Sequence, residues 1–414
     1  MTSIIVLGLV LYMGSCATGP DKAPVSAAQT DTTILISIDG FRSEYLDRGV
    51  TPALSSLASD GVRSSMMPAF PSVTFPNHFT LVTGLYPDHH GIVDNHFEDH
   101  DLGKVWDIND PQGAADPAWW TGATALWATA EEQGVRAGVM FWPSVGYDKS
   151  GKPPALFEPF NPNTPMIDEP DKVFAWLDKS AAERPRFILL YFYLVDHVAH
   201  KYGPRAKETE DAMRQADAAI GKLIDGLKAR QLFLHTNIVI VADHGMTDIS
   251  KERVIPIEKI VGVNKVRIVT SGAVSGFEPK PGNERYAEQK LLGHHKHVEC
   301  WRKSEMPARF HYGTNKRIPP IVCLSDLGWE MVTKDDVKWL DDSHGDHGFD
   351  PAEADMAAVF VAHGPAFKRS ITWPKFVNVD VYPMLAKIMG IKVPPSDGNL
   401  SDVDGMLARP VPAH

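Results

Sequence analysis

Aspartate and histidine side chains recur in three short motifs of this 414-residue sequence, at spacings that could bind a metal ion. The motif "VDHVAH" places Asp196 and His200 four residues apart, so one helical turn would put both side chains on the same face. The motif "ADHG" supplies Asp243 and His244, and "HGDHGFD" supplies His347. Mixed aspartate and histidine ligands are typical of Zn²⁺, whereas oxygen ligands alone would have indicated Mg²⁺ or Ca²⁺. A single aspartate more often caps a helix and a single histidine more often lies on the surface or in the core, but the three motifs together favour a zinc site.

A threonine, Thr74, lies in the stretch "FPSVTFPNHFTLVTGLYPDHHGI" at what reads as the start of a helix. Thr74 can act as the N-cap, Pro76 suits the first turn because its missing N–H costs nothing there, and Gly84 is placed to end the helix. The N-terminus of a helix presents unpaired N–H groups and the positive end of the helix dipole. A hydroxyl at this position therefore faces a site suited to phosphate or another anion. The alternative is that Thr74 only caps the helix.

Four apolar runs, each ending in an acidic or polar residue, indicate the elements that must position these side chains. They are Thr33–Gly40, Phe187–Asp196, Asn237–Gly245 and Ala357–Gly364. Nearly continuous apolar strands are typical of a sheet covered on both faces, and helical patterns such as Ala206–Arg230 lie between them. We therefore expect an α/β fold, a three-layer α/β/α sandwich around a mostly parallel central sheet. Ligands gather at the carboxyl ends of strands in such sheets, where Asp39, Asp196 and Asp243 are expected to stand.

The rest of the chain divides into a leader, a tether and one catalytic domain. Residues 1–16 contain an apolar run that is too short to span a bilayer but has the length of a signal-peptide core. Cys16 follows Met-Gly-Ser, which resembles a bacterial lipoprotein cleavage site, and an ordinary secretory signal is the alternative. Residues 17–31 are small, polar and proline-containing, as a tether would be. Residues 32–414 form the expected catalytic domain, in which residues 249–341 read as an irregular inserted cap.

The leader predicts an exported, periplasmic protein, with attachment to the outer membrane where Cys16 is lipidated. An exported protein favours a disulfide between Cys300 and Cys323, although two free buried cysteines are the alternative. The formal net charge of -11 argues against a nucleic-acid backbone as the main partner.

Five motifs together resemble one known family, the nucleotide pyrophosphatase/phosphodiesterases of the alkaline phosphatase superfamily. The motifs are "ISIDGFRSEYL", "FPSVTFPNHFTLVTGLYPDHHGIVDN", "YLVDHVAHKYGP", "VADHGM" and "GDHGFD". They occur in the order of the family and with similar gaps, from about Thr32 to about Gly390. The resemblance covers nearly the whole chain apart from the leader and tether, and it implies an alkaline-phosphatase-like fold.

The resemblance implies two zinc ions per chain. One zinc would be held by Asp196, His200 and His347, and the other by Asp39, Asp243, His244 and the Thr74 oxygen. Coordination to zinc would convert the Thr74 hydroxyl into a nucleophilic alkoxide. Attack on a nucleotide phosphodiester or pyrophosphate would then give a covalent phosphothreonine intermediate, whose hydrolysis releases a nucleoside monophosphate. Asn95 and the backbone N–H of Phe75 would stabilise the charge on the phosphate oxygens.

The family also suggests how a small-molecule nucleotide would be held. A nucleobase is clamped between aromatic residues, which Phe75 and Phe157 match here. Trp106, Trp119 and Trp120 are left outside the predicted site because tryptophans are more often core residues. The alternatives are a phosphomonoesterase, a sulfatase, a lipid phosphodiesterase or a catalytically silent zinc protein. A sulfatase is disfavoured because its nucleophile is usually a modified Cys or Ser, and position 74 is Thr.

Overall fold

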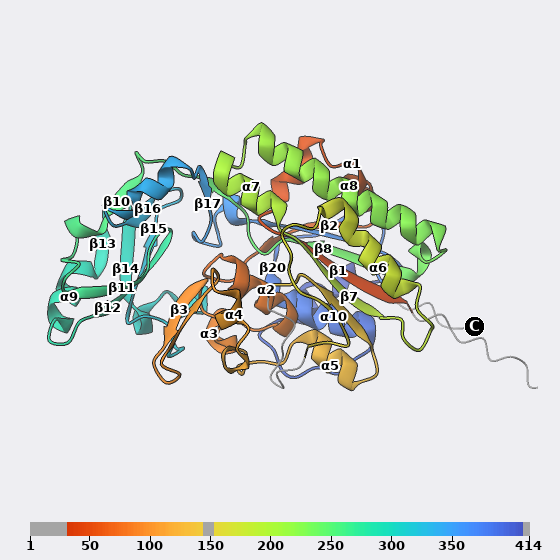
Figure 1. The fold of residues 1–414 in the computed structure, drawn as a ribbon, viewed down its shortest axis with the longest axis horizontal. Coiled ribbons are helices and arrows are strands. Elements are labelled where there is room, and N and C mark those ends of the chain that lie inside the picture. Colours follow the sequence, from red (N-terminus) through yellow and green to blue (C-terminus); the bar gives the residue numbers. More distant parts are fainter. Residues whose placement is uncertain (1–30, 144–152, 409–414) are drawn as a thin grey trace, which may run out of the picture. The chain divides into compact units, whose positions relative to one another are not determined.

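A nine-stranded sheet forms the centre of the fold in the computed structural model, which describes residues 31–143 and 153–408 (Figure 1). The strands lie in the order β19-β2-β18-β8-β1-β7-β5-β6, and β20 also pairs with β2. Their bounds are β1 (Thr32–Ile38), β2 (Val62–Met67), β5 (Ala137–Met140), β6 (Leu156–Glu158), β7 (Phe187–Phe192), β8 (Thr236–Val241), β18 (Ala358–His363), β19 (Ile371–Thr372) and β20 (Phe376–Val377). Every side chain of β1 is buried, as expected of a strand that is covered on both faces.

The sheet is mostly parallel, as predicted. β1 pairs in parallel with both β7 and β8, so the carboxyl ends of these three strands meet at one edge. β18 is antiparallel to both of its neighbours, β8 and β2. Because of this direction, the polar carboxyl-terminal end of the run Ala357–Gly364 lies at the opposite end of the strands from Asp39 and Asp243.

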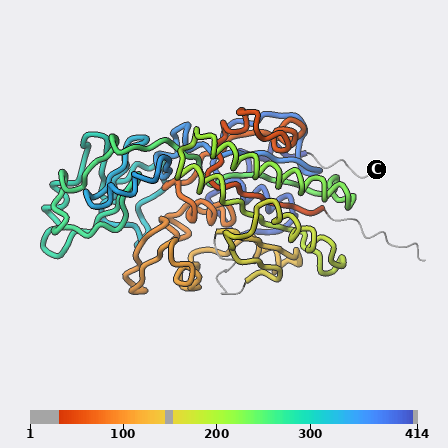
Figure 2. Tube along the Cα trace, turned by 45° about the horizontal axis from the view of Figure 1, so that its top comes forward, coloured from red at the N-terminus to blue at the C-terminus, as the bar shows by residue number. Residues whose placement is uncertain are grey.

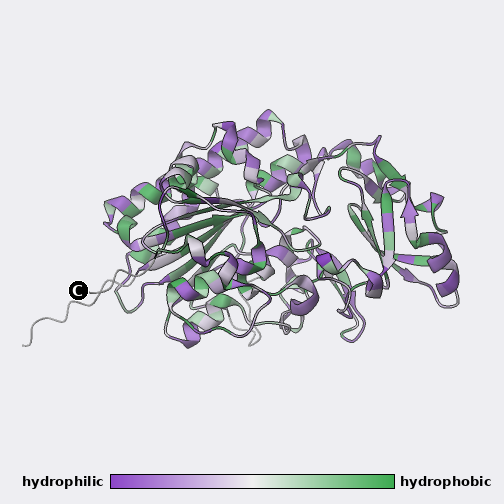
Figure 3. Ribbon diagram, turned by 180° about the vertical axis from the view of Figure 1, so that it is seen from behind, coloured by the Kyte–Doolittle hydropathy of each residue, from purple (hydrophilic) through white to green (hydrophobic). Residues whose placement is uncertain are grey.

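Helices cover both faces of the sheet, which confirms the predicted three-layer sandwich (Figures 1 and 2). One face carries α1 (Pro52–Asp60), α6 (Glu169–Leu177), α7 (Leu194–Tyr202) and α8 (Lys207–Ala229). The other carries α2 (Thr74–Thr83), α5 (Leu126–Glu132) and α10 (Val381–Met389). The strands are largely apolar, whereas the helices combine apolar and polar faces (Figure 3). This difference places the hydrophobic core on the two surfaces of the sheet.

The inserted region is more regular than its sequence suggested. It contains a five-stranded sheet in the order β11-β12-β15-β14-β13, in which each pair of neighbours is antiparallel. Its elements are β11 (Val266–Thr270), β12 (Val274–Pro279), α9 (Glu284–Leu291), β13 (Gly293–His295), β14 (Val298–Arg302) and β15 (Ile321–Ser325). Cys300 and Cys323 lie opposite each other on β14 and β15, and the structure contains the predicted disulfide between them.

Short helices and strands complete the fold around the insert and the main sheet. They are α3 (Pro87–His90), β3 (His96–Asp99), β4 (Lys104–Asp107), α4 (Pro111–Ala114), β9 (Thr247–Asp248), β10 (Val254–Pro256), β16 (Glu330–Val332) and β17 (Gly345–Asp346). Asp88 in α3 accepts hydrogen bonds from the backbone N–H groups of Gly313 and Asn315, at 3.0 and 2.8 Å. Arg317 donates to Asp99 at the end of β3 over 2.7 Å. These bonds hold the segment between β14 and β15 against α3 and the β3–β4 hairpin.

The predicted leader and all of the tether but Asp31 lie outside the described residues. Among the residues that are described, no helix is both long and apolar enough to cross a membrane.

Candidate active site

The carboxyl ends of three neighbouring strands deliver the predicted polar side chains to one place. Asp39 directly follows β1, and Asp243 follows β8 by two residues. The run that ends in Asp196 behaves differently from the prediction, because β7 ends at Phe192 and α7 begins at Leu194. Asp196 and His200 therefore both lie on α7, four residues apart, as the "VDHVAH" spacing predicted.

Asp196, His200 and His347 form the first group that could hold a metal ion. Their ligand atoms all lie within 4.8 Å of one another. Oδ2 of Asp196 lies 3.4 Å from Nε2 of His200, and Oδ1 lies 3.7 Å from Nε2 of His347. Nδ1 of His200 donates to the carbonyl of Gly345 over 2.8 Å, and Nδ1 of His347 donates to the carbonyl of Ser72 over 2.9 Å. Each bond holds the proton on Nδ1 and leaves Nε2 as the atom that could bind a metal.

The second predicted ligand set surrounds Nε2 of His244. This atom lies 2.9 Å from Oδ2 of Asp243, 3.5 Å from Oδ1 of Asp39 and 3.2 Å from Oγ1 of Thr74. Nδ1 of His244 donates to the carbonyl of Gly245 over 2.8 Å, so Nε2 is again the atom directed into the site. Asp39 also belongs to a group with Asp196 and His244, so the two predicted sets adjoin each other.

Thr74 is the first residue of α2, and its predicted role as N-cap is wrong by one position. Val73 occupies the N-cap in an extended conformation, and no side chain caps this end of the helix. The Thr74 hydroxyl is therefore not occupied in capping and lies beside His244. Gly84 ends the helix in the left-handed conformation, as predicted.

His78 is a buried residue of the site that the sequence analysis did not single out. Its Nδ1 donates to the carbonyl of Thr74 over 2.8 Å and lies 3.4 Å from Oδ2 of Asp243. Its Nε2 accepts a hydrogen bond of 2.8 Å from the hydroxyl of Ser37. Asp39, His78 and Asp243 are close enough to hold a metal, but both ring nitrogens of His78 already have partners. The position of His78 four residues after Thr74 was the available signal, because it places both residues on one face of α2.

Tyr191 is the second residue that sequence reasoning missed. It lies on β7 opposite Ser37 of β1, and its hydroxyl donates to Oδ2 of Asp39. In the sequence, the only signal for Tyr191 was a hydroxyl group inside an otherwise apolar strand.

Gly40 contributes to the site through its backbone, whose N–H donates to Oδ1 of Asp243 over 3.2 Å. Its φ of +63° is one that glycine adopts readily, and a Cβ there would lie 2.9 Å from Oδ1 of Asp196.

The electrostatics of the site fit bound cations. Burial, together with the Asp243 and Asp196 carboxylates, raises the pKa of Asp39 well above its usual value. Burial would also raise the pKa of Asp243, but the His244 and His78 imidazoles outweigh it and hold that pKa below its usual range. Three carboxylates of the site each have one oxygen without a hydrogen-bond partner among the described residues. These atoms are Oδ1 of Asp39, Oδ1 of Asp196 and Oδ2 of Asp243. Buried carboxylates without partners are costly unless a cation balances them, so the donor set suits zinc.

Asn95 lies beside Thr74, but its contact with Phe75 differs from the expected one. The backbone N–H of Phe75 donates to Oδ1 of Asn95 over 3.0 Å, so this N–H is engaged rather than available to a phosphate oxygen. The bond leaves Nδ2 as the donor of the Asn95 amide. Of the two predicted donors to a phosphate, Asn95 stays a prediction, because only the Phe75 N–H is engaged by another group.

A cavity of about 630 Å³ opens beside Thr74, and its wall is mainly apolar and rich in aromatic residues. Phe75 and Phe157 line it as predicted. The other aromatic residues in its wall are Phe141, Trp142, Phe160 and Tyr191. Trp106, Trp119 and Trp120 are buried core residues outside its lining, in agreement with the sequence analysis. We call this space the aromatic cavity.

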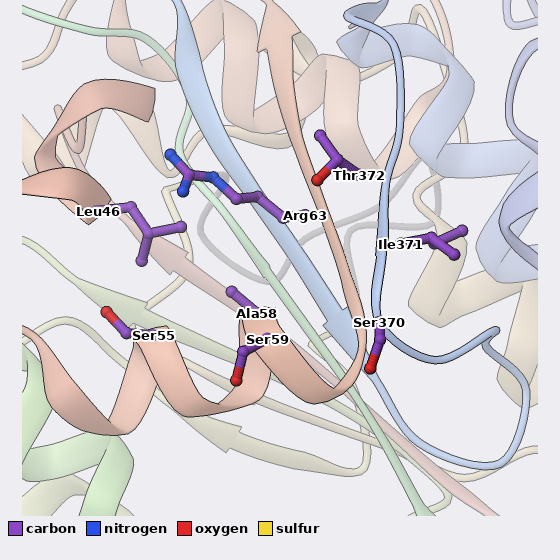
Figure 4. Close-up of a pocket in the computed structure, with 8 residues that line it drawn as sticks. All are labelled: Leu46, Ser55, Ala58, Ser59, Arg63, Ser370, Ile371 and Thr372. Carbon is purple, nitrogen blue, oxygen red and sulfur yellow. The ribbon is translucent and has the colours of Figure 1, made fainter.

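A separate cavity of about 330 Å³ lies between α1, β2 and β19 (Figure 4). Its wall combines Arg63 with several serine and threonine residues, but Arg63 already pairs with Asp47 at 2.6 Å. The lining contains no histidine, cysteine or carboxylate, so this cavity is not the candidate active site.

Comparisons with known proteins agree with this geometry. Residues 33–350 match the family model described as type I phosphodiesterase / nucleotide pyrophosphatase. An uncharacterized pyrophosphatase/phosphodiesterase of Schizosaccharomyces pombe is 36% identical, over 89% of this chain and 78% of the relative. The bis(5'-adenosyl)-triphosphatase enpp4 of Xenopus laevis is 33% identical, over 97% of this chain and 86% of the relative.

A solved structure shares the fold. Murine ectonucleotide pyrophosphatase/phosphodiesterase 5, in an inactive Thr-to-Ala variant bound to AMP, superimposes with a TM-score of 0.86 and 30% identity. The match covers 91% of this chain and 100% of the murine chain. Together with the family model, these relatives show that the chain belongs to the type I phosphodiesterase / nucleotide pyrophosphatase family of the alkaline phosphatase superfamily.

Proposed function

We propose that the protein is a two-zinc hydrolase that cleaves nucleotide phosphodiester or pyrophosphate bonds through a covalent phosphothreonine on Thr74 and releases a nucleoside monophosphate. The observation that carries this proposal is the position of the Thr74 hydroxyl. It lies 3.2 Å from Nε2 of His244, at the first residue of α2, in the wall of the aromatic cavity. A nucleophile, the metal-binding groups and a space for a base thus adjoin one another.

Two groups of side chains would hold the metals. One consists of Asp196, His200 and His347, and the other of Asp39, Asp243, His244 and the Thr74 oxygen. When bound, zinc ions act as Lewis acids that lower the pKa of a coordinated hydroxyl group and stabilise negative charge on oxygen.

The residues of the chain then carry the reaction. Oγ1 of Thr74 attacks phosphorus as its proton passes to solvent water, and the bond between phosphorus and the leaving oxygen breaks as the new bond forms, so that the leaving oxygen takes up a proton from water. Asn95 donates from Nδ2 to a phosphate oxygen and stabilises its charge. Water attacks the phosphothreonine, the bond from phosphorus to Thr74 breaks, and the nucleoside monophosphate departs while Thr74 regains a proton. The inactivity of the Thr-to-Ala variant of the murine structural neighbour supports a threonine nucleophile.

The aromatic cavity would bind the nucleobase. Phe75 and Phe157 provide faces for stacking, and stacked aromatic pairs add stability beyond the area that they bury. The murine neighbour is solved with AMP, and the Xenopus relative is named for a dinucleotide substrate, so both support a nucleotide.

The protein would act outside the cytoplasm. The disulfide between Cys300 and Cys323 supports this location, because disulfides persist in oxidising compartments. Export to the periplasm, and attachment to the outer membrane through a lipidated Cys16, remain proposals from the leader sequence.

Initial rates on a p-nitrophenyl nucleotide diester and on p-nitrophenyl phosphate, both with Zn²⁺ present, test the function. We expect a large preference for the diester. A preference for the monoester would overturn the substrate assignment while leaving the metal site in place. The variant Thr74→Ala should lose turnover and keep its zinc and its fold; turnover equal to that of the wild type would refute Thr74 as nucleophile.

A further inference from the structure

A third cavity, of about 290 Å³, adjoins two of the predicted metal ligands. His200 and His347 stand in its wall, whereas Thr74 and Phe75 line only the aromatic cavity. Ile108 lines both cavities, so the two spaces share a wall beside the candidate active site. The active site therefore has a second space that the aromatic cavity does not account for.

The inserted region forms part of this second wall. Residues 270–274, at the turn between β11 and β12, face the cavity together with His96 and Asp107 of the β3–β4 hairpin. The bond from Arg317 to Asp99 described above holds the insert against this hairpin. The insert, whose role the sequence did not reveal, thus contributes directly to the surroundings of the active site.

The wall contains the carboxyl groups of Asp94, Asp107 and Asp346 beside three imidazoles, and none of its described lining residues is Lys or Arg. Burial raises the pKa of Asp94 to about 7, so this group is only partly ionised at neutral pH. Burial alone would raise the pKa of Asp107, but hydrogen bonds from the Asn109 N–H and from His96 outweigh it and lower that pKa. Asp107 is therefore ionised at neutral pH, and it is partly exposed to the cavity. We call this space the acidic cavity.

A buried carboxylate lies directly behind the wall. Glu330 is fully buried, and neither of its carboxylate oxygens has a hydrogen-bond partner among the described residues. Its Oε2 lies 3.1 Å from the place that a Cβ on Gly272 would occupy, so it reaches the wall at a residue without a side chain. Burial and the Asp346 carboxylate raise the pKa of Glu330 well above its usual value, as expected of an acid in a negative field.

We propose that the acidic cavity receives the leaving group and selects leaving groups that are cationic or neutral over polyphosphates. This inference rests on the proposed function. In an in-line displacement the leaving oxygen departs opposite the nucleophile. Thr74 lines only the aromatic cavity, whereas His200 and His347 line only the acidic cavity, so we assign the leaving group to the side of His200 and His347. A pyrophosphate there would meet Asp107 and its neighbours, and repulsion would weaken its binding.

Three derivatives of AMP test the selection. All three retain the same nucleotide, AMP, and differ only in the leaving group. The choline ester has a cationic leaving group, the 3,3-dimethylbutyl ester is its neutral isostere, and ATP has a pyrophosphate leaving group. Each variant is compared with the wild type through the ratio of kcat/KM for the choline ester to kcat/KM for ATP, so that intrinsic reactivity cancels. Asp107→Asn, which removes one charge from the wall, should lower this ratio about tenfold.

A second variant tests the wall from the side of the insert. Ser271 is exposed in the cavity wall, so Ser271→Lys adds a positive charge there and should lower the same ratio about tenfold or more. The matched control is Asp101→Asn, which removes an exposed charge at the turn of the same hairpin but outside the cavity lining. It should leave the ratio unchanged.

The possible outcomes separate the failure of this inference from the failure of the proposed function. If the wild type cleaves the neutral ester and both variants leave the ratio unchanged, the acidic cavity does not select the leaving group and this inference is overturned. An equal loss of kcat/KM on all three substrates in the Asp107→Asn and Ser271→Lys variants would also overturn it, because such a loss would indicate that the two residues have only a structural role. If the wild type cleaves none of the three substrates, the proposed function itself fails.

Discussion

The backbone N–H of Phe75 donates a hydrogen bond of 3.0 Å to Oδ1 of Asn95, and this bond sets the orientation of the Asn95 amide beside Thr74. The variant Asn95→Asp keeps the acceptor for Phe75 but replaces the donor, Nδ2, with a negatively charged oxygen. We expect kcat on a nucleotide diester to fall about 10²- to 10³-fold, as for loss of a donor to a developing oxyanion. The melting temperature should change little. The control is Asn264→Asp, at an exposed position of the insert; equal rates in the two variants would exclude a role for Asn95 in catalysis.

Removal of one predicted ligand should remove metal and activity together. His347→Ala takes away Nε2 of the group with Asp196 and His200, and should lower the zinc content by about one ion per chain. The control is His344→Ala, three residues earlier, where the side chain is exposed. Zinc content is measured by atomic absorption on dialysed protein. Full zinc content in the His347 variant would contradict the ligand assignment.

The hydrogen bond from Tyr191 to Asp39 should tune metal affinity. Tyr191→Phe keeps the ring in the wall of the aromatic cavity but removes the donor to Oδ2 of Asp39. Loss of such a supporting bond typically weakens metal binding about 10- to 100-fold, and we expect that change in the zinc dissociation constant. Tyr193→Phe is the matched control, since its hydroxyl donates to the carbonyl of Pro162 and not to a predicted ligand. Equal affinities in the two variants would show that Tyr191 does not support Asp39.

Local spacing made much of the site readable in the sequence. Asp196 and His200 meet because a helix brings residues four apart onto one face, and Asp243 and His244 meet because they are adjacent. Asp39 and Asp243 join them because parallel strands end at one edge. These relationships depend on short-range geometry and on the alternation of apolar and polar runs, both of which are visible in one sequence.

The missed residues depend on contacts between distant parts of the chain. His78 bonds Ser37 across 41 residues, and Tyr191 bonds Asp39 across 152. In sequence, each looks like an ordinary residue of a buried helix or strand. The insert was misread for a related reason, because its strand β13 has only three residues and its strands pair across intervening loops and a helix. Such short elements show too few residues for a periodicity to emerge.

A buried acid far from the metal-binding groups gives a prediction about stability. Glu169, the first residue of α6, is almost fully buried, and its Oε2 has no hydrogen-bond partner among the described residues. Burial raises its pKa from 4.5 to about 9. Between these values the folded state keeps the proton that the unfolded state has lost, so the wild-type protein becomes less stable as the pH rises through this range.

The variant Glu169→Gln removes this titration from both states. Its free energy of unfolding, relative to the wild type, should therefore rise with pH by up to about 1.4 kcal/mol per pH unit between pH 5 and pH 8. Any fixed cost of burying the amide shifts the whole curve without changing its slope, and contributions of the metal site cancel in the difference. Urea unfolding at several pH values measures the slope, with the exposed Glu208→Gln as control. A flat difference for Glu169→Gln would mean that Glu169 ionises in the folded state at its ordinary pKa, because only a proton held by the folded protein can produce the predicted slope.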